Sequence, residues 1–277
     1  MTTANSLAEE RNEALLGWYE IRSRDLPWRS TTDPYQVLVS EFMLQQTQVT
    51  RVVVHYERFI ERFPRVEDLA AAPLGDVLAA WSGLGYNIRA QRLRESARVI
   101  VDRGWPTDVA GLQELPGIGP YTAAALASFA LGQRIPAVDT NLRRVLSRWH
   151  GEPLDGAALM AAAQDAIAEQ ASAWNQAMMD LGATVCRPRG PRCESCPVTA
   201  WCSGPDGYEA ATAQARFEGS ARQLRGAIVR SVVRGPQRFE SLRRETGFPT
   251  AEIEMAIEDL VSEGLITDDG GVYRPAD

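Results

Sequence analysis

The sequence predicts a chain that is all-α through about its first 215 residues and that ends in a small module of different character. Three observations support this prediction. Apolar residues recur at helical spacing, alternating strand patterns are scarce, and Pro and Gly stand where consecutive helices should end. We expect helices at 6–21, 34–44, 47–63, 66–71, 74–81, 88–103, 109–114, 121–131, 140–149, 156–169 and 171–181.

The last part of the chain reads differently. Residues 206–221 are small and polar, as in a linker, and three amphipathic helices are expected at 222–234, 239–245 and 250–263, the last with Thr250 as its N-cap. A hairpin with a turn at 268–271 should follow. Three helices and a hairpin are the order of a winged-helix module, and both DNA contact and simple packing stay open as its role.

Composition excludes several classes of mechanism. The formal net charge is −7, which argues against a protein that coats nucleic acid by bulk charge. All 29 basic residues are Arg, so catalysis through a lysine Schiff base, a Walker lysine or a Ser–Lys dyad is excluded. His55 and His150 are the two histidines, too few for a histidine-rich metal centre.

The N-terminus lacks the pattern of a secretory signal, and the longest uncharged apolar stretch, 121–131, is too short to span a membrane. All four cysteines lie within a short stretch, which is unlike a disulfide framework. We therefore expect a cytoplasmic protein without membrane contact.

The cysteines follow the pattern Cys186-x6-Cys193-x2-Cys196-x5-Cys202. A zinc ribbon usually has two Cys-x2-Cys pairs, whereas this loop has one, so a structural 4Fe–4S cluster is favoured over zinc or free thiols. Three arginines in the longest gap are either phosphate contacts or solvated side chains: Arg187, Arg189 and Arg192.

The segment Leu-Pro-Gly-Ile-Gly-Pro-Tyr-Thr at 115–122 joins a short helix to an Ala-rich one. Gly117 and Gly119 permit a tight turn and a close backbone approach, and the N–H groups at the start of the second helix favour an anion. This pattern is typical of a helix-hairpin-helix, which holds a DNA phosphate without reading sequence.

Two carboxylates stand in unusual surroundings. Glu41 lies in an apolar and amide-rich segment, where desolvation raises a carboxyl pKa towards the range of a general acid. Asp139 follows an apolar pair at the start of a helix, where a simple N-cap is the alternative interpretation.

Taken in order, SEFMLQQTQV, WSGLGYNIRA, LPGIGPYTAAA, AVDTNLRRVLSR, WNQAMMDLGATVC and the cysteine loop resemble the MutY-type adenine DNA glycosylases of the endonuclease III superfamily, over about residues 15–205. The resemblance implies a two-lobed helix-hairpin-helix glycosylase domain at 1–205. Its cluster loop lies at 186–202, and a linker and the module at 222–277 follow.

The resemblance also implies roles for individual residues. Glu41 matches the general acid, Asp139 the essential aspartate and Asn141 its partner, while Tyr121 stands where strand-cutting relatives carry a lysine. The adenine pocket matches Trp28, Arg29 and Gln176, and the residues that wedge into the base stack match Gln46 and Tyr86.

The implied function is a monofunctional base excision repair glycosylase, which flips out and hydrolyses adenine mispaired with 8-oxoguanine or guanine in double-stranded DNA. We expect a nucleoid-associated monomer. Two departures stand out: Asn87 replaces a usual tyrosine, and the usual pyrophosphohydrolase-like C-terminal domain is replaced by the short module. A thymine or uracil mismatch glycosylase and a non-catalytic iron–sulfur DNA sensor remain alternatives.

Overall fold

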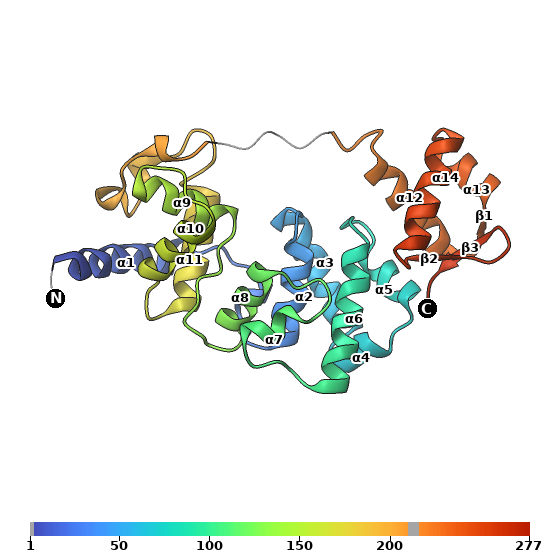
Figure 1. The fold of residues 1–277 in the computed structure, drawn as a ribbon, viewed down its shortest axis with the longest axis horizontal. Coiled ribbons are helices and arrows are strands. Elements are labelled where there is room, and N and C mark those ends of the chain that lie inside the picture. Colours follow the sequence, from blue (N-terminus) through green and yellow to red (C-terminus); the bar gives the residue numbers. More distant parts are fainter. Residues whose placement is uncertain (1–2, 210–215) are drawn as a thin grey trace. The chain divides into compact units, whose positions relative to one another are not determined.

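A computed structural model describes residues 3–209 and 216–277. Contacts between Cα atoms group these residues into two compact units (Figure 1). Unit 1 holds the described residues of Met1–Val37, Thr107–Gln113 and Ile118–Ala213, and unit 2 those of Leu38–Pro106, Glu114–Gly117 and Gln214–Asp277. The chain is mainly helical, as predicted.

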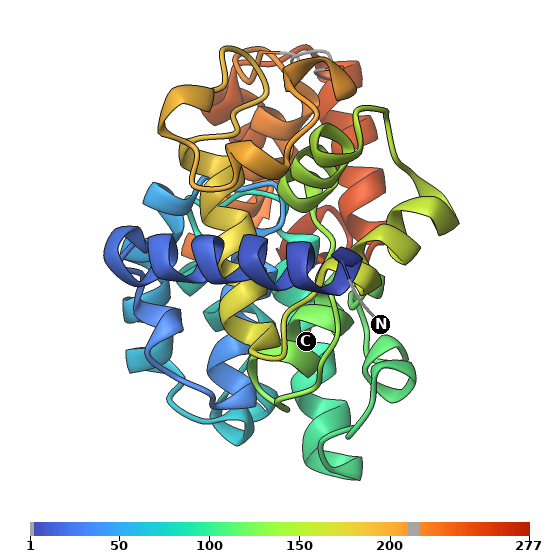
Figure 2. The same cartoon turned by 90° about the vertical axis from the view of Figure 1, so that its left-hand side faces the viewer.

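Unit 1 is built around one apolar core. Its longer helices are α1 (Thr3–Arg22), α8 (Pro120–Phe129), α9 (Thr140–His150), α10 (Gly156–Ala166) and α11 (Ala171–Thr184), with the short α7 (Val109–Gln113) beside α8. Figure 2 shows α1 lying across α11. Leu15, Leu142 and Trp174 are fully buried in this core, and Val198 anchors the cysteine loop to it.

Unit 2 combines the middle of the chain with its end. The helix α2 (Pro34–Leu44) runs into it and is followed by α3 (Val49–Arg62), α4 (Val66–Ala71), α5 (Leu74–Trp81) and α6 (Ile88–Arg103). Phe59 and Trp81 are both fully buried and meet edge to face, with ring centroids 5.9 Å apart.

The C-terminal segment belongs to unit 2 and packs against it through α12 (Ala221–Arg234), which contacts α5. The segment continues with β1 (Gln237–Arg238), α13 (Phe239–Thr246), α14 (Thr250–Ser262), β2 (Ile266–Asp268) and β3 (Val272–Pro275). The three strands form an antiparallel sheet in the order β1-β3-β2, with Thr267 opposite Arg274. The hairpin is confirmed, whereas β1 was not predicted because it is only two residues long.

Several predicted boundaries need correction. The helix expected at 156–169 ends at Ala166, because the extended Ile167 turns into the core. Thr250 is the first residue of α14, so the N-cap is Pro249. The helix expected at 121–131 begins with Pro120, which suits a first helical position that needs no N–H. The linker predicted at 206–221 falls partly on 210–215, outside the described residues.

No helix among the described residues is long and apolar enough to cross a bilayer.

Candidate active site and DNA-contacting surfaces

Asp139 caps α9 in unit 1. Its Oδ1 accepts hydrogen bonds from the backbone N–H groups of Asn141 and Leu142, both at 2.8 Å, and its Oδ2 accepts one from Asn141 Nδ2 at 2.6 Å. The N-cap interpretation is therefore correct, and it is compatible with a catalytic role because the half-buried carboxylate is held in one orientation.

Burial raises the pKa of Asp139 above its ordinary value, and hydrogen bonds from Leu142 and Asn141 and the charge of Arg144 oppose this shift. The net direction is upward. Burial and the surrounding polar groups thus shift the pKa of Asp139 in opposite directions. The lowering effect depends in part on Asn141.

Arg144 connects this carboxylate to the cysteine loop. Its Nη2 donates to Asn141 Oδ1 at 2.8 Å and to the Gly182 carbonyl at 2.7 Å, while its Nε donates to the Cys186 carbonyl at 2.7 Å. Gly182 permits this close packing, because a Cβ there would lie 2.5 Å from Asn141 Cβ. Arg144 is buried, so the position of Asn141 depends on a residue that the sequence analysis did not single out.

The four cysteines line one small pocket of unit 1, together with Arg148. The buried Arg148 donates from Nη1 to Cys186 Sγ at 3.3 Å, and the Cys202 thiol faces the Arg148 carbonyl at 3.4 Å. Burial, with a smaller contribution from the neighbouring cysteines, raises the pKa of Cys196 to about 11. Even so, no group of three or more Cys, His, Asp or Glu among the described residues is arranged to hold a metal ion.

The three arginines of this loop differ in exposure. Arg189 and Arg192 are exposed, whereas Arg187 is half-buried and donates to the Gly190 carbonyl at 2.8 Å. Arg187 therefore stabilises the fold of its own loop, while Arg189 and Arg192 remain accessible to an anion.

A second carboxylate in unit 1 organises the predicted base-binding residues. Asp180 is fully buried and accepts hydrogen bonds from Arg29 Nη1 and Nη2 at 2.8 and 2.7 Å and from Arg24 Nε at 2.6 Å. Burial alone raises the pKa of Asp180, but Arg29 and Arg24 outweigh it and the pKa lies below its ordinary value. Asp180 is thus an ionised anchor for Arg29.

Arg29 and Gln176 line an open pocket of about 500 Å³, together with Tyr19. The Tyr19 hydroxyl donates to Gln176 Oε1 at 2.7 Å, and the Arg29 guanidinium lies over the Tyr19 ring. Trp28 is buried, 8% exposed, and does not line this pocket. The pocket therefore has two of the three predicted base-binding residues and adds Tyr19, which the sequence analysis missed.

Tyr121 lies in the first turn of α8 and packs against the small core cluster of Ala124, Ala125 and Ala137. Ala137 of that cluster lies two residues before Asp139 in the chain. Tyr121 is thus placed in unit 1 with Asp139 and Asn141.

Glu41 lies on α2 in unit 2 and is 4% exposed. The next two residues along the helix, Phe42 and Met43, are fully buried.

The two predicted wedge residues, Gln46 and Tyr86, have positive φ angles of 55° and 49°. They are the non-glycine residues with positive φ among the described part of the chain. Such conformations are uncommon and persist only where the surroundings hold them. The positive φ angles of these two residues indicate that other parts of the protein hold both loops in place.

Arg89 supplies that constraint. Its guanidinium donates to the carbonyls of Phe42, Met43 and Gln45 around the first loop and to those of Leu84 and Gly85 in the second. Arg89 is buried, and desolvation lowers its pKa to about 10, so it remains charged at neutral pH. One buried cation thereby fixes the backbones that carry both wedge residues.

The two glycines of the hairpin differ in what they do. Gly117 has φ +80°, and a Cβ there would lie 2.8 Å from Arg92 Cβ and 3.0 Å from the Phe42 ring. Gly119 is the N-cap of α8 in an ordinary extended conformation, with nothing within 4 Å of its Cβ position. Gly117 is required by the fold, whereas the space beside Gly119 is open to a ligand.

The structure thus groups the site residues by unit. Unit 1 holds Asp139, Asn141 and Tyr121, the base pocket and the cysteines, and unit 2 holds Glu41, Gln46 and Tyr86. The sequence analysis missed the buried ionic residues that hold these groups in place, namely Arg89, Arg144, Arg148 and Asp180. A charged residue on the apolar stripe of a helix was the available signal.

The chain is similar to known proteins in sequence and in fold. A family model described as the HhH-GPD superfamily of base excision DNA repair proteins matches residues 39–168. Among solved structures, a thermostable thymine-DNA glycosylase is 30% identical with a TM-score of 0.69, covering 74% of this chain and 99% of its own. A trapped endonuclease III–DNA intermediate, 23% identical with a TM-score of 0.62 over 75% of this chain and 98% of its own, shows the same fold. Fold and motifs thus place the chain among helix-hairpin-helix base excision repair proteins.

Curated relatives narrow this class. The adenine DNA glycosylase of Mycobacterium tuberculosis H37Rv is 41% identical, covering 91% of this chain and 89% of the relative, and that of Mycolicibacterium smegmatis is 42% identical, covering 91% of each. The human adenine DNA glycosylase is 42% identical over 68% of this chain and 38% of its own length. The chain belongs to the adenine DNA glycosylase family.

Proposed function

We propose that this member of the family is a monofunctional glycosylase, which removes adenine mispaired with 8-oxoguanine or guanine in duplex DNA. The observation that carries the proposal is the Asp139 carboxylate, held by three hydrogen bonds at the start of α9, in a chain 41% identical to adenine DNA glycosylases over most of its length.

Hydrolysis of the N-glycosidic bond needs a proton donor and a group that stabilises the sugar cation. In this proposal the buried Glu41 donates a proton to adenine N7, the C1′–N9 bond breaks, and the base leaves with the electron pair. The ionised Asp139 then stabilises the positive charge at C1′ until water adds there. Asn141 positions Asp139, and Tyr121 takes the place of the lysine that would convert the product into a strand break.

The remaining site residues serve base extrusion and binding. Gln46 and Tyr86, held by Arg89, offset the loss of stacking when the adenine leaves the duplex. Arg29, Gln176 and Tyr19 bind the extruded base in their common pocket, whose lining does not include the buried Trp28.

Three parts of the chain are proposed to contact the DNA backbone or to organise that contact. The hairpin residues Gly117 and Gly119 offer backbone N–H groups to a phosphate, and Arg189 and Arg192 offer guanidiniums. The C-terminal segment after the 206–221 linker is proposed to be a winged-helix module, supported by its order of helices and its three-stranded sheet.

The cysteines are proposed to hold a 4Fe–4S cluster. Four thiols on one pocket are the donor set of such a cluster, and the hydrogen bond from Arg148 to Cys186 Sγ suits a thiolate ligand. With four protein ligands the cluster would order the loop of Arg189 and Arg192 rather than take part in hydrolysis.

The structural similarity to a thymine-DNA glycosylase supports a second candidate function, the removal of thymine or uracil opposite guanine. A panel of duplexes with adenine opposite 8-oxoguanine, adenine opposite guanine, and thymine or uracil opposite guanine separates the two. We expect rapid removal from the adenine duplexes and abasic products that stay intact until alkali or heat is applied. Removal of thymine or uracil alone would contradict the proposal, as would borohydride trapping of a covalent adduct.

A further inference from the structure

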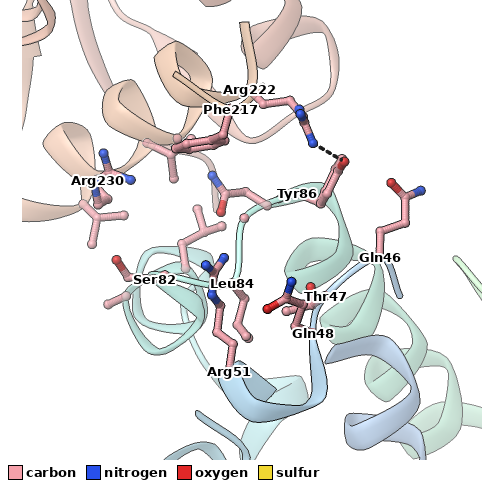
Figure 3. Close-up of a pocket in the computed structure, with 18 of the residues that line it drawn as sticks. Gln46, Thr47, Gln48, Arg51, Ser82, Leu84, Tyr86, Phe217, Arg222 and Arg230 are labelled. Atoms are coloured by element: carbon pink, nitrogen blue, oxygen red, sulfur yellow. Dashed lines mark hydrogen bonds between the residues drawn. The ribbon is translucent and has the colours of Figure 1, made fainter. Parts of the chain in front are cut away.

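A cavity of unit 2 lies between the 82–87 loop and α12, and the proposed reaction uses only Gln46 and Tyr86 at its border. Its volume is about 680 Å³, within the range of small-molecule sites. Figure 3 shows Gln46 and Tyr86, the two wedge residues, on its border.

The lining of this cavity is strongly basic in an acidic protein. Four arginines line it and no Asp or Glu does: Arg51, Arg222, Arg230 and Arg234. Arg234 pairs with Glu245, and Arg222 donates to the Tyr86 hydroxyl at 3.0 Å. Arg51 and Arg230 are exposed, and neither forms an ion pair with a described residue. Two guanidiniums from different helices, α3 and α12, are therefore available to an anion.

The cavity also offers an aromatic face. Phe217 lines it and is 56% exposed, so its ring is accessible to a ligand. Positive charge beside an exposed ring is the combination that binds nucleotides, because the phosphate meets the arginine and the base stacks on the ring.

Two glycines line opposite walls of the cavity. Gly226 lies inside α12, where glycine destabilises a helix by about 1 kcal/mol relative to alanine, and a Cβ there would lie 3.4 Å from Arg230 Nη1. On the facing wall Gly83 has φ +100°, and a Cβ there would lie 2.7 Å from His55 Nε2. His55 also approaches the Ser82 carbonyl at 3.0 Å, which fixes the loop.

We propose that this cavity binds one nucleotide of the DNA strand beside Tyr86, with Arg51 and Arg230 contacting its phosphates and Phe217 stacking on its base. The C-terminal segment would then be part of the DNA-binding surface rather than a packing unit. The inference rests on the proposed function in one respect, that duplex DNA is the substrate.

Point variants test the site without removing α12. Arg51→Ala and Arg230→Ala should each weaken binding of a mispaired duplex about tenfold and reduce the slope of log affinity against log salt by about 0.9. Phe217→Ala should weaken binding at least about fivefold with an unchanged slope, because stacking releases no counterion. The matched control is Arg244→Ala, an exposed arginine of α13 that does not line the cavity.

Two further measurements make the outcome decisive. 2-Aminopurine placed singly along the duplex should be quenched at one position by the wild type and not by Phe217→Ala. The single-turnover excision rate at saturating enzyme should stay within about twofold in all cavity variants, since none touches the reacting bond. If the wild type does not excise adenine, the proposed function is wrong. The affinities of the cavity variants for duplex DNA would still test the nucleotide site.

Unchanged affinity and slope in the Arg51 and Arg230 variants would overturn the inference. It would also be overturned if the variants lost binding of free deoxynucleoside monophosphates while duplex affinity stayed constant, because the ligand would then be a free nucleotide. Thermal unfolding of each variant identifies any loss that arises from the fold.

Discussion

The surroundings of Asp139 in unit 1 and the cavity of unit 2 use polar groups in opposite ways. Around Asp139 the polar side chains are bonded to one another: Asn141 donates a hydrogen bond to the carboxylate, and Arg144 donates one to Asn141. In the cavity, Arg51 and Arg230 are exposed, and neither forms an ion pair with a described residue, although the Arg230 charge helps to lower the pKa of Glu245. Catalytic groups must be held in position before the substrate binds. Arginines that bind DNA, in contrast, must be free to pair with its phosphates.

The largest expected effect comes from the two carboxylates. Asp139→Asn keeps the N-cap geometry but removes the charge that stabilises the sugar cation, and Glu41→Gln removes the proton donor. General acid catalysis typically contributes about 10²–10⁴-fold, and loss of one electrostatic stabiliser of the transition state typically costs about 10²–10³-fold, so each variant should lower the single-turnover rate by at least about 10²-fold. Duplex affinity should change little. A rate within about threefold of the wild type would remove that residue from the mechanism.

The next largest effect concerns Arg89, the buried arginine of unit 2 that bonds the backbone of both wedge loops. Arg89→Ala removes one donor from five backbone carbonyls of the two wedge loops, of which Gln45 and Gly85 keep hydrogen bonds from Thr47 and Trp81. We expect a loss of unfolding free energy of about 3 kcal/mol or more. Arg89→Lys keeps the charge but lacks the fork of N–H groups. It should therefore fold yet lose most quenching of a 2-aminopurine neighbour by the wedge.

Equal behaviour of Arg89→Lys and the wild type in that fluorescence assay would show that the strained φ angles of Gln46 and Tyr86 do not depend on the guanidinium. Denaturant unfolding measured on both variants separates a general loss of stability from a local change in the loops.

The sequence predicted the mainly helical fold with good boundaries, because helical spacing and breakers are local signals. Helix α6, expected at 88–103, is one of several whose ends agree with the structure. The strand β1 escaped prediction because two residues carry no periodicity. Thr250 was placed one residue out of register because a capping residue and a first-turn residue look alike in sequence.

The candidate site was predictable only where a motif carried it. Asp139 and Glu41 stand in recognisable segments, but Asp180 and Arg89 act through partners far away in the chain, such as Arg29 and Gln45. The salt link from Asp180 to Arg29 spans residues that no local pattern connects. Arg222, similarly, reaches Tyr86 from the far end of the sequence.

The third effect is a pH dependence. The excision rate should fall as pH decreases through the pKa of Asp139, because the protonated acid no longer stabilises the cation, and burial places that pKa above the ordinary value. Asn141→Ala removes hydrogen bonding to the charged form, which raises the pKa further. The acidic limb of the rate profile should therefore move to higher pH in that variant.

Rates measured under single-turnover conditions across the acidic range check this prediction, with Ser262→Ala, at an exposed residue of α14, as a control that leaves the Asp139 contacts and the base pocket intact. An acidic limb that stays in place, or moves to lower pH, would show that another group governs it.

The smallest effect separates the two glycines of the hairpin. Gly117→Ala must place a Cβ at φ +80° against Arg92 and Phe42, so it should lower the unfolding free energy by about 1–3 kcal/mol. Gly119→Ala has an ordinary φ and open space, and its loss of N-cap preference is a few tenths of a kcal/mol, so stability should stay within about 0.5 kcal/mol. The methyl group would nevertheless occupy the space through which a phosphate reaches the backbone, and duplex affinity should fall several-fold.

The comparison therefore rests on two measurements, denaturant unfolding and duplex binding, made on the same pair of variants. If Gly119→Ala binds DNA as tightly as the wild type, the open space beside Gly119 is not a phosphate site, and the role of the hairpin is confined to the turn that Gly117 makes.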